Sequence, residues 1–214
     1  WDVDGRLLEQ VAHPRLCRQL HLPLQSGSDA VLRRMGRRID TATFARVVAD
    51  ARAVSPDVAV TTDLIAGFPG ETEADFEASL AFVERMAFAR LHVFPYSERE
   101  GTAAVRLPGH MPKRVRSARA ARLRALGRTL KRAYHERFLG QVLPVLWERA
   151  ETRAAEDDQA DANDDGRRVW RGLTDNYLAV KATSKAQLYN KIVPARLLAY
   201  QRGVIKGELA GGVI

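Results

Sequence analysis

Apolar runs and amphipathic stretches alternate along the first part of the chain. Three short runs are apolar or β-branched and have the length of buried strands. These runs are 20–24, 58–66 and 91–94. Between them, apolar residues recur every three or four positions, as on a helix with one buried face. This alternation predicts parallel β-α units, because a crossover helix must join each strand to the next. The expected units are 20–54, 58–86 and 89–138.

Residues that favour helix N-termini precede the amphipathic stretches. Ser28 precedes a short helix, and Thr72 precedes a longer one. Asp40 or Thr41 precedes a helix that continues to Val54. Side-chain oxygens at such positions accept hydrogen bonds from the free backbone N–H groups of the first turn. We therefore expect helices to begin directly after these residues.

Short strand patterns follow one another in the last part of the chain. They cover 142–147, 169–180 (as strand, turn and strand), 191–198 and 203–209. So many short strands in so few residues predict a small β-barrel. The segment 149–166 is acidic and rich in Ala, without apolar periodicity, so we expect a disordered insertion there. The predicted domains are 1–111, a connecting helix at 112–139 and the barrel at 140–214.

Positive charge is concentrated in one predicted helix. The net charge of the chain is +8, and the segment 112–137 holds ten Lys or Arg and a single acid, Glu136. Apolar residues from Val115 to Tyr134 form one seam of this helix, which leaves a wide basic face. A basic stripe of this kind favours a polyanion partner, either RNA or DNA.

Composition excludes some other classes of protein. No run approaches the ~18 apolar residues that a membrane span needs. The first residues are acidic where a signal peptide would be basic, so we expect a cytoplasmic protein. Cys17 is the only cysteine, and we expect it to be a buried, inert thiol. One cysteine makes neither an internal disulfide nor a protein-ligated iron–sulfur cluster, so no metal site is predicted.

Polar and glycine-rich turns follow the predicted strands. One turn begins Gln25-Ser26-Gly27, and another runs from Asp63 through Gly67 and Gly70. Gly allows the backbone to approach a ligand closely, and an acid within a buried strand is costly unless it is paired or ligand-bound. The turns after the strands of an α/β barrel build its active site. The pattern indicates a nucleotide-like pocket, although plain strand-to-helix turns would look the same.

These turns, with the segment 91–97, carry a family resemblance. Residues 20–104 resemble the later strands of the radical S-adenosylmethionine (SAM) tRNA methylthiotransferases, and 140–209 resemble their C-terminal TRAM domain. The phrase Leu91-His92-Val93-Phe94-Pro95-Tyr96-Ser97, with Gly101-Thr102 after it, is most similar to the subgroup that modifies N6-threonylcarbamoyladenosine beside the tRNA anticodon. The resemblance implies an α/β fold, the second half of a radical SAM (β/α) barrel, followed by a small all-β TRAM-like barrel.

The resemblance also implies a SAM site. Gln25 would contact the ribose or methionine part, Arg37 the SAM carboxylate and Asp63 the ribose hydroxyls. The implied cofactor-binding positions are Gln25, Ser26, Arg37, Asp63, Ile65, Tyr96 and Ser97. The last three of these positions would adjoin the adenine. A solvated arginine is the alternative for Arg37, and a packed core residue is the alternative for His92. No residue is predicted to be catalytic.

One part of the family pattern is missing. Family members carry a CxxxCxxC motif and a further cysteine set, which bind two 4Fe-4S clusters. Cys17 lies outside both motifs, so the resemblance implies that the cluster ligands belong to a missing N-terminal half of the same protein. With the clusters, the family abstracts hydrogen from C2 of a modified adenosine, inserts sulfur and methylates it with a second SAM. We expect this fragment alone to be inactive.

The implied macromolecular partner is the tRNA anticodon stem-loop. The predicted RNA-binding residues are Arg119, Arg122, Lys131, Trp170 and Tyr177. The basic side chains would contact phosphates, and the two aromatic rings would stack on unpaired bases. The alternatives are a solvated basic face and an aromatic barrel core. Two other functions stay open, a non-catalytic RNA-binding fragment and a methylthiotransferase that acts on a ribosomal protein aspartate.

Overall fold

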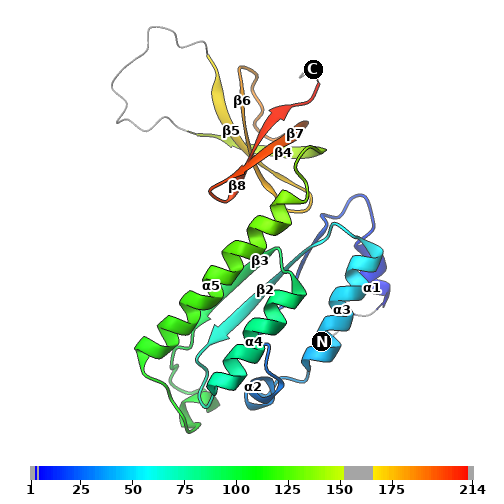
Figure 1. Cartoon of the computed structure of the whole chain (residues 1–214). Coiled ribbons are helices and arrows are strands. Elements are labelled where there is room, and N and C mark those ends of the chain that lie inside the picture. Colours follow the sequence, from blue (N-terminus) through cyan, green and yellow to red (C-terminus); the bar gives the residue numbers. More distant parts are fainter. Residues whose placement is uncertain (1–2, 4, 152–165, 212–214) are drawn as a thin grey trace, which may run out of the picture. The chain divides into compact units, whose positions relative to one another are not determined.

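A computed structural model describes residues 3, 5–151 and 166–211 of the chain (Figure 1). The chain divides into two compact units, the first ending at Tyr134 and the second beginning at His135. The first unit combines a parallel sheet with helices, and the second is a closed β-barrel.

The sheet of the first unit has three parallel strands, as the alternating pattern predicts. They are β1 (Gln19–His21), β2 (Ala59–Ala66) and β3 (Arg90–Pro95), in the order β1-β2-β3. β1 is shorter than the expected run 20–24, and its pairing with β2 ends at His21. Beyond Pro23, which has no N–H to donate, Gln25 forms an isolated bridge to Leu64.

Among the described residues, five α-helices and one short 3₁₀-helix accompany the sheet. They are α1 (Gly5–Gln10), α2 (Asp29–Arg34), α3 (Thr41–Val54), α4 (Glu73–Met86), η1 (Ala103–Arg106) and α5 (Lys113–Glu136). The predicted caps Ser28 and Thr72 are confirmed, and Asp40 rather than Thr41 caps α3. Thr72 also forms a reciprocal capping box with Asp75, which satisfies two backbone donors at the start of α4.

The core of the first unit lies between the sheet and the helices. Alternate residues of β2, such as Leu64 and Ala66, are fully buried against α3 and α4. Phe44 of α3 meets Phe82 of α4 and Phe88 edge to face, with ring centroids 6.2 and 5.9 Å apart. Burial of such side chains, each worth about 1.5–3 kcal/mol, fixes the sheet against its helices.

The second unit is a closed five-stranded barrel, which confirms the predicted small barrel. Its strands are β4 (Val142–Ala150), β5 (Arg168–Thr174), β6 (Ala179–Ser184), β7 (Lys191–Gln201) and β8 (Val204–Leu209). Their order around the barrel is β4-β5-β6-β8-β7. Trp147, Leu178 and Leu197 are fully buried inside it. Closure leaves no unpaired strand edge, which allows so small a unit to bury its interior.

Two expectations from the sequence are wrong. β4 continues to Ala150, three residues past Trp147, and pairs there with Arg171 and Trp170 of β5, so the start of the expected insertion is a strand. The rest of that insertion, 152–165, lies outside the described residues. Cys17 is exposed rather than buried, because it lies in the turn before β1. Within the described ranges, no helix is long and apolar enough to cross a membrane.

Candidate functional site

The face of the sheet opposite the core carries polar side chains. Thr61, Asp63 and Ile65 alternate along β2 with core residues, because successive side chains of a strand point to opposite faces. In the parallel register, Asp63 lies beside His92 of β3, and Ile65 lies beside Phe94. Phe94 is 53% exposed, so this face is open to a ligand.

Asp63 is the centre of a polar group on that face. His21 Nε2 lies 3.3 Å from Asp63 Oδ2, and His21 Nδ1 lies 3.0 Å from Thr61 Oγ1. The ring of His92 meets that of His21 edge to face, with centroids 5.9 Å apart. Burial lowers the pKa of His92, and the charge of Arg90 adds to that effect while Asp63 opposes it. The pairing with His21 offsets the cost of an acid within the sheet, and the Asp63 side chain keeps 29% of its surface exposed.

Several predicted site residues meet at the carboxyl edge of the sheet. Gln25 has a φ of +74° and is fixed by two backbone hydrogen bonds. Its N–H donates to the Asp63 carbonyl at 2.8 Å, and its own carbonyl accepts from the Ile65 N–H at 2.9 Å. On the other side of β2, the Tyr96 N–H donates to the Ala66 carbonyl at 2.8 Å. The backbones of Gln25, Asp63, Ile65 and Tyr96 are therefore held side by side, although the residues are far apart in sequence.

Two other predicted residues are not part of this group. Ser26 is 2% exposed, and its hydroxyl accepts from the Ser28 N–H at 3.2 Å, so it stabilises its own turn. The Gly27 N–H donates to Ser79 Oγ at 2.8 Å, and a Cβ at Gly27 would lie 2.8 Å from Ser79 Cα. Arg37 is exposed between α2 and α3, and in the described part of the chain no interaction joins it to the other positions.

Tyr96 and Ser97 line a pocket of about 360 Å³ beyond the end of β3. Its lining residues are Pro95, Tyr96, Ser97, Glu98, Lys113, Arg116 and Ser117. The Tyr96 ring packs edge to face against Phe68, with centroids 5.4 Å apart, and Arg116 Nη1 donates to the Tyr96 carbonyl at 2.8 Å. The Tyr96 hydroxyl is buried and has no hydrogen-bond partner among the described residues. Burial raises the pKa of Tyr96, and the charge of Glu98 adds to that effect while Arg116 opposes it.

The turn after β2 is held by Glu71, which sequence reasoning missed. Gly67 has a φ of +77°, and its N–H donates to both carboxylate oxygens of Glu71 at 3.2 and 3.3 Å. Arg119 Nη1 of α5 donates to Glu71 Oε1 at 2.6 Å. The side chains of Glu71 and Arg119 are only 3% and 9% exposed. Burial raises the pKa of Glu71, while Arg119 and the Gly67 N–H act in the opposite direction.

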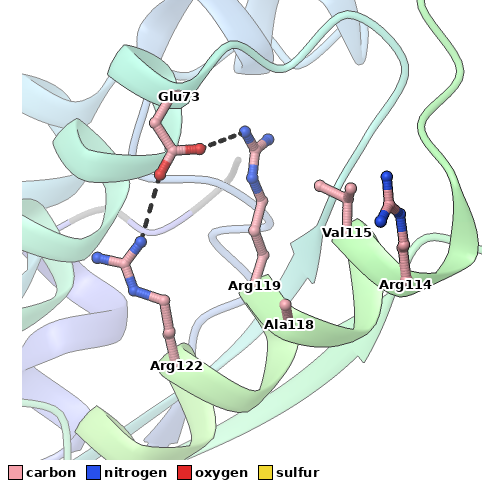
Figure 2. Close-up of a pocket in the computed structure, with 6 residues that line it drawn as sticks. All are labelled: Glu73, Arg114, Val115, Ala118, Arg119 and Arg122. Carbon is pink, nitrogen blue, oxygen red and sulfur yellow. Dashed lines mark hydrogen bonds and ion pairs between the residues drawn. The ribbon is translucent and has the colours of Figure 1, made fainter.

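Arg119 and Arg122 belong to an ion-pair network between α4 and α5, shown in Figure 2. Arg119 Nη2 donates to Glu73 at 2.7 Å, and Arg122 donates to Glu73 at 3.3 Å and to Glu77 at 2.6 Å. The pocket of about 360 Å³ beside them is lined by Glu73, Arg114, Val115, Ala118, Arg119 and Arg122. These two arginines, predicted to bind RNA, are neutralised by carboxylates of the same unit.

The other predicted RNA-binding residues differ in accessibility. Trp170 is 2% exposed, inside the barrel, so its ring is not available for stacking on a base. Tyr177 is 52% exposed in the turn between β5 and β6, where its φ is +60°. Lys131 is half-buried on α5, and burial lowers its pKa.

This chain does not itself supply the ligands of an iron–sulfur cluster. Such clusters are held by several Cys thiolates, and Cys17 is the only cysteine of the chain. In the described part of the chain, no group of three or more His, Cys, Asp or Glu side chains could hold a metal ion.

Comparison with known proteins finds a matching superfamily and several relatives. The radical SAM superfamily profile matches residues 2–83. The chain is 38% identical to a tRNA-2-methylthio-N(6)-dimethylallyladenosine synthase of Oleidesulfovibrio alaskensis, over 98% of the chain and 47% of that protein. It is 44% identical to a threonylcarbamoyladenosine tRNA methylthiotransferase of Thermotoga maritima, over 69% of the chain and 34% of that protein. The matching enzyme of Bacillus subtilis is 35% identical over 86% of the chain and 39% of its own length.

The chain thus spans less than half the length of these curated relatives. The matched superfamily segment contains Gln25, Asp63 and the Gly67 turn, which are the elements that build the carboxyl edge of the sheet. The chain belongs to the radical SAM tRNA methylthiotransferase family.

Proposed function

We propose that this chain is the part of a tRNA methylthiotransferase that holds SAM at the carboxyl edge of β1–β3 and contacts tRNA. The whole protein would add a methylthio group to an N6-modified adenosine next to the anticodon. The observation that carries the proposal is the meeting of Gln25, Asp63, Ile65 and Tyr96 at this edge. In parallel α/β folds, ligands bind at the carboxyl ends of the strands.

The residues at this edge have the chemistry of a SAM site. His21 contacts Asp63 at Oδ2, so Oδ1 is left to accept a hydrogen bond from a ribose hydroxyl. Ile65 offers an apolar surface to an adenine ring, and the buried hydroxyl of Tyr96 offers a donor. SAM, when bound, supplies the methyl and 5′-deoxyadenosyl groups of the family's chemistry. Ser26, Arg37 and Ser97 remain proposed neighbours of the cofactor.

The two 4Fe-4S clusters would be held by other parts of the whole protein, which makes the missing N-terminal half a necessary partner. We expect the chain without that half to lack methylthiolation activity. A tRNA substrate would also place the whole protein in the cytoplasm.

The chemistry of the open face favours N6-threonylcarbamoyladenosine as the substrate. A threonylcarbamoyl group carries a carboxylate, whereas a dimethylallyl group is apolar. His21 and His92 lie on the open face, since they share its register with Thr61 and Asp63. Cations and N–H donors suit an anionic substituent. The relatives include enzymes named for each substrate, so this choice rests on the face and on the phrase Leu91–Ser97.

Mass spectrometry of tRNA nucleosides would test the proposed function. The whole protein that carries this chain would be expressed in cells that lack the methylthio group on both adenosine derivatives. We expect the group to appear on N6-threonylcarbamoyladenosine. Its appearance on the dimethylallyl derivative would change the substrate, and its absence from both would contradict the enzymatic proposal.

The second candidate is a non-catalytic RNA-binding module. The basic segment 112–137 favours this candidate, because its cations suit an RNA backbone. The single cysteine, Cys17, also favours it, because one thiol cannot hold the cluster that the enzyme needs. This reading needs no SAM site, so binding of tRNA without any binding of SAM would support it over the enzyme.

A further inference from the structure

Four cationic side chains line one hollow between β3 and α5. They are Arg90, Arg124, Arg128 and Lys131, and the remaining lining residues are Leu91 and Gly127. The hollow has a volume of about 220 Å³, and none of its lining residues is acidic. No carboxylate lines this space, so an anion that enters it would be attracted by the surrounding cations.

The backbone of the two elements brings these cations together. Arg124, Arg128 and Lys131 are spaced four and three residues apart on α5, so they share one face of the helix. Gly127 lets α5 approach β3, because a Cβ there would lie 3.2 Å from the Leu91 side chain. Arg124 Nη2 donates to the Val93 carbonyl at 3.0 Å, which anchors one member of the cluster.

The opposite flank of α5 is different. There Arg119 and Arg122 are paired with Glu71, Glu73 and Glu77 of the same unit. The lining of the hollow has no such carboxylate. Burial and the charge of Arg90 both lower the pKa of Lys131, so the environment there is already unfavourable to one more positive charge. The flank that faces β3 therefore gathers cations around a hollow whose lining holds no carboxylate.

We propose that the hollow lined by Arg90, Arg124, Arg128 and Lys131 binds a phosphate group of an RNA backbone. The choice of RNA rests on the proposed function, because members of this family modify tRNA. Guanidinium groups bind phosphate oxygens through paired N–H donors, and an ammonium adds a point charge. Such a contact would fix the register of the RNA on this unit and would carry no base specificity.

Salt-dependent binding of a tRNA anticodon stem-loop tests this proposal. The 214-residue chain would be titrated with labelled RNA by fluorescence anisotropy at several KCl concentrations. Arg128→Gln and Arg90→Gln each remove one cation from the hollow. Arg85→Gln, on the exposed side of α4, and Arg46→Gln, on the exposed side of α3, are the matched controls. Circular dichroism of each variant would verify that the helices are intact.

We expect each variant in the hollow to weaken RNA binding roughly five- to tenfold at 0.1 M salt. The slope of log K against log salt should become shallower by about 0.7–0.9, the value for one lost phosphate contact. The two control variants should bind like the wild type. Equal losses in all four variants would contradict the site and indicate general charge attraction.

A second arm separates RNA from free phosphate. Replacing chloride by inorganic phosphate at equal ionic strength should leave RNA binding nearly unchanged if the hollow is specific for the backbone. Strong displacement by phosphate would assign the site to a free anion and overturn the RNA assignment. If the wild-type chain binds no RNA at all, the proposed contact with tRNA fails together with this site. If it binds RNA and the hollow variants do not weaken it, only this site fails.

Discussion

Replacing Arg119 by Met tests whether the turn after β2 depends on α5. Arg119 donates to Glu71 at 2.6 Å and to Glu73 at 2.7 Å, and its side chain is 9% exposed. Met keeps an unbranched apolar stem of similar length, so the packing against the Phe76 ring, 5.1 Å from the guanidinium, is largely retained. The substitution therefore removes mainly the charge and its hydrogen bonds.

The expected cost follows from the burial of Glu71. The Glu71 side chain is 3% exposed. Without Arg119, its carboxylate would lose the guanidinium donor and keep the hydrogen bond from the Gly67 N–H. Breaking a buried ion pair at one partner costs about 3–5 kcal/mol, because a buried charge is left uncompensated. Arg122→Met is the matched control, since Arg122 also pairs with Glu73 and packs on Phe76 but is 50% exposed. An exposed pair of this kind is worth about 0–1 kcal/mol.

Urea unfolding of the 214-residue chain can follow the two units separately. The described helices up to α5 dominate the circular dichroism signal, whereas buried Trp147 and Trp170 make tryptophan fluorescence sensitive to the barrel. With a slope of about 2 kcal/mol per molar urea, Arg119→Met should lower the circular dichroism midpoint by about 2 M. The fluorescence transition of the barrel should move little.

The pH dependence supplies an independent check. Burial already raises the pKa of Glu71, and removing Arg119 takes away a contribution that lowers it. A carboxyl whose pKa is higher in the folded than in the unfolded protein destabilises the fold when the pH lies above its ordinary pKa of 4.5. This cost disappears as the pH falls through the raised pKa, because the carboxyl then becomes protonated and uncharged. The difference between variant and wild type should therefore shrink toward pH 4.5. A loss below about 1 kcal/mol at pH 7, or a loss equal to that of Arg122→Met, would refute the reasoning.

Two further substitutions test the elements around the site. Gly67→Ala should lower stability by about 1–3 kcal/mol in thermal unfolding, because φ is +77° and the new Cβ would lie 2.6 Å from Arg116 Cγ. Gly36→Ala is the control, because Gly36 has a φ of +71° but open space around it, and it should lose less stability than Gly67→Ala. Equal losses of stability in the two variants would contradict a steric clash at Gly67. Asp75→Asn should cost about 1 kcal/mol at pH 7, because Asp75 accepts from Ser28 Oγ at 2.7 Å. Burial opposes the shift, but hydrogen bonds from Ser28 and the α4 cap lower the pKa of Asp75, so the wild type should lose this advantage as the pH falls below 3.8. A gap between Asp75→Asn and wild type that stays constant down to pH 2 would contradict this assignment.

Local features of the fold are predictable from the sequence because they depend on neighbours along the chain. The caps Ser28 and Thr72 act on backbone N–H groups within the next few residues, so their oxygens suffice to locate the helices. The apolar run of β2 and the helical spacing of apolar residues in α4 likewise predict the bounds of these two elements to within a residue or two. The boundary of β4 is missed because Glu148 and Arg149 look like loop residues, although Arg149 continues the ladder with β5 beyond an irregularity at Glu148.

The use of charged residues is not predictable in this way. Arg119 and Glu71 are 48 positions apart, and only the packing of α5 beside the β2 turn makes them a pair. A count of cations along α5 therefore cannot separate neutralised Arg119 and Arg122 from the cations around the β3 hollow. Trp170 was ambiguous for a related reason, because an aromatic residue in a short strand suits both a barrel core and a base-stacking surface.

Binding of SAM to the whole protein, measured by isothermal titration calorimetry, tests the central claim most directly. A hydrogen bond to a charged group is worth about 1.5–3 kcal/mol, so Asp63→Asn should weaken SAM binding at least tenfold. Asp50→Asn, on the exposed side of α3, removes the same charge away from the carboxyl edge and should bind SAM like the wild type. Equal affinity in Asp63→Asn and the wild type, or no binding of SAM by the folded wild type, would contradict the assignment of this edge to the cofactor.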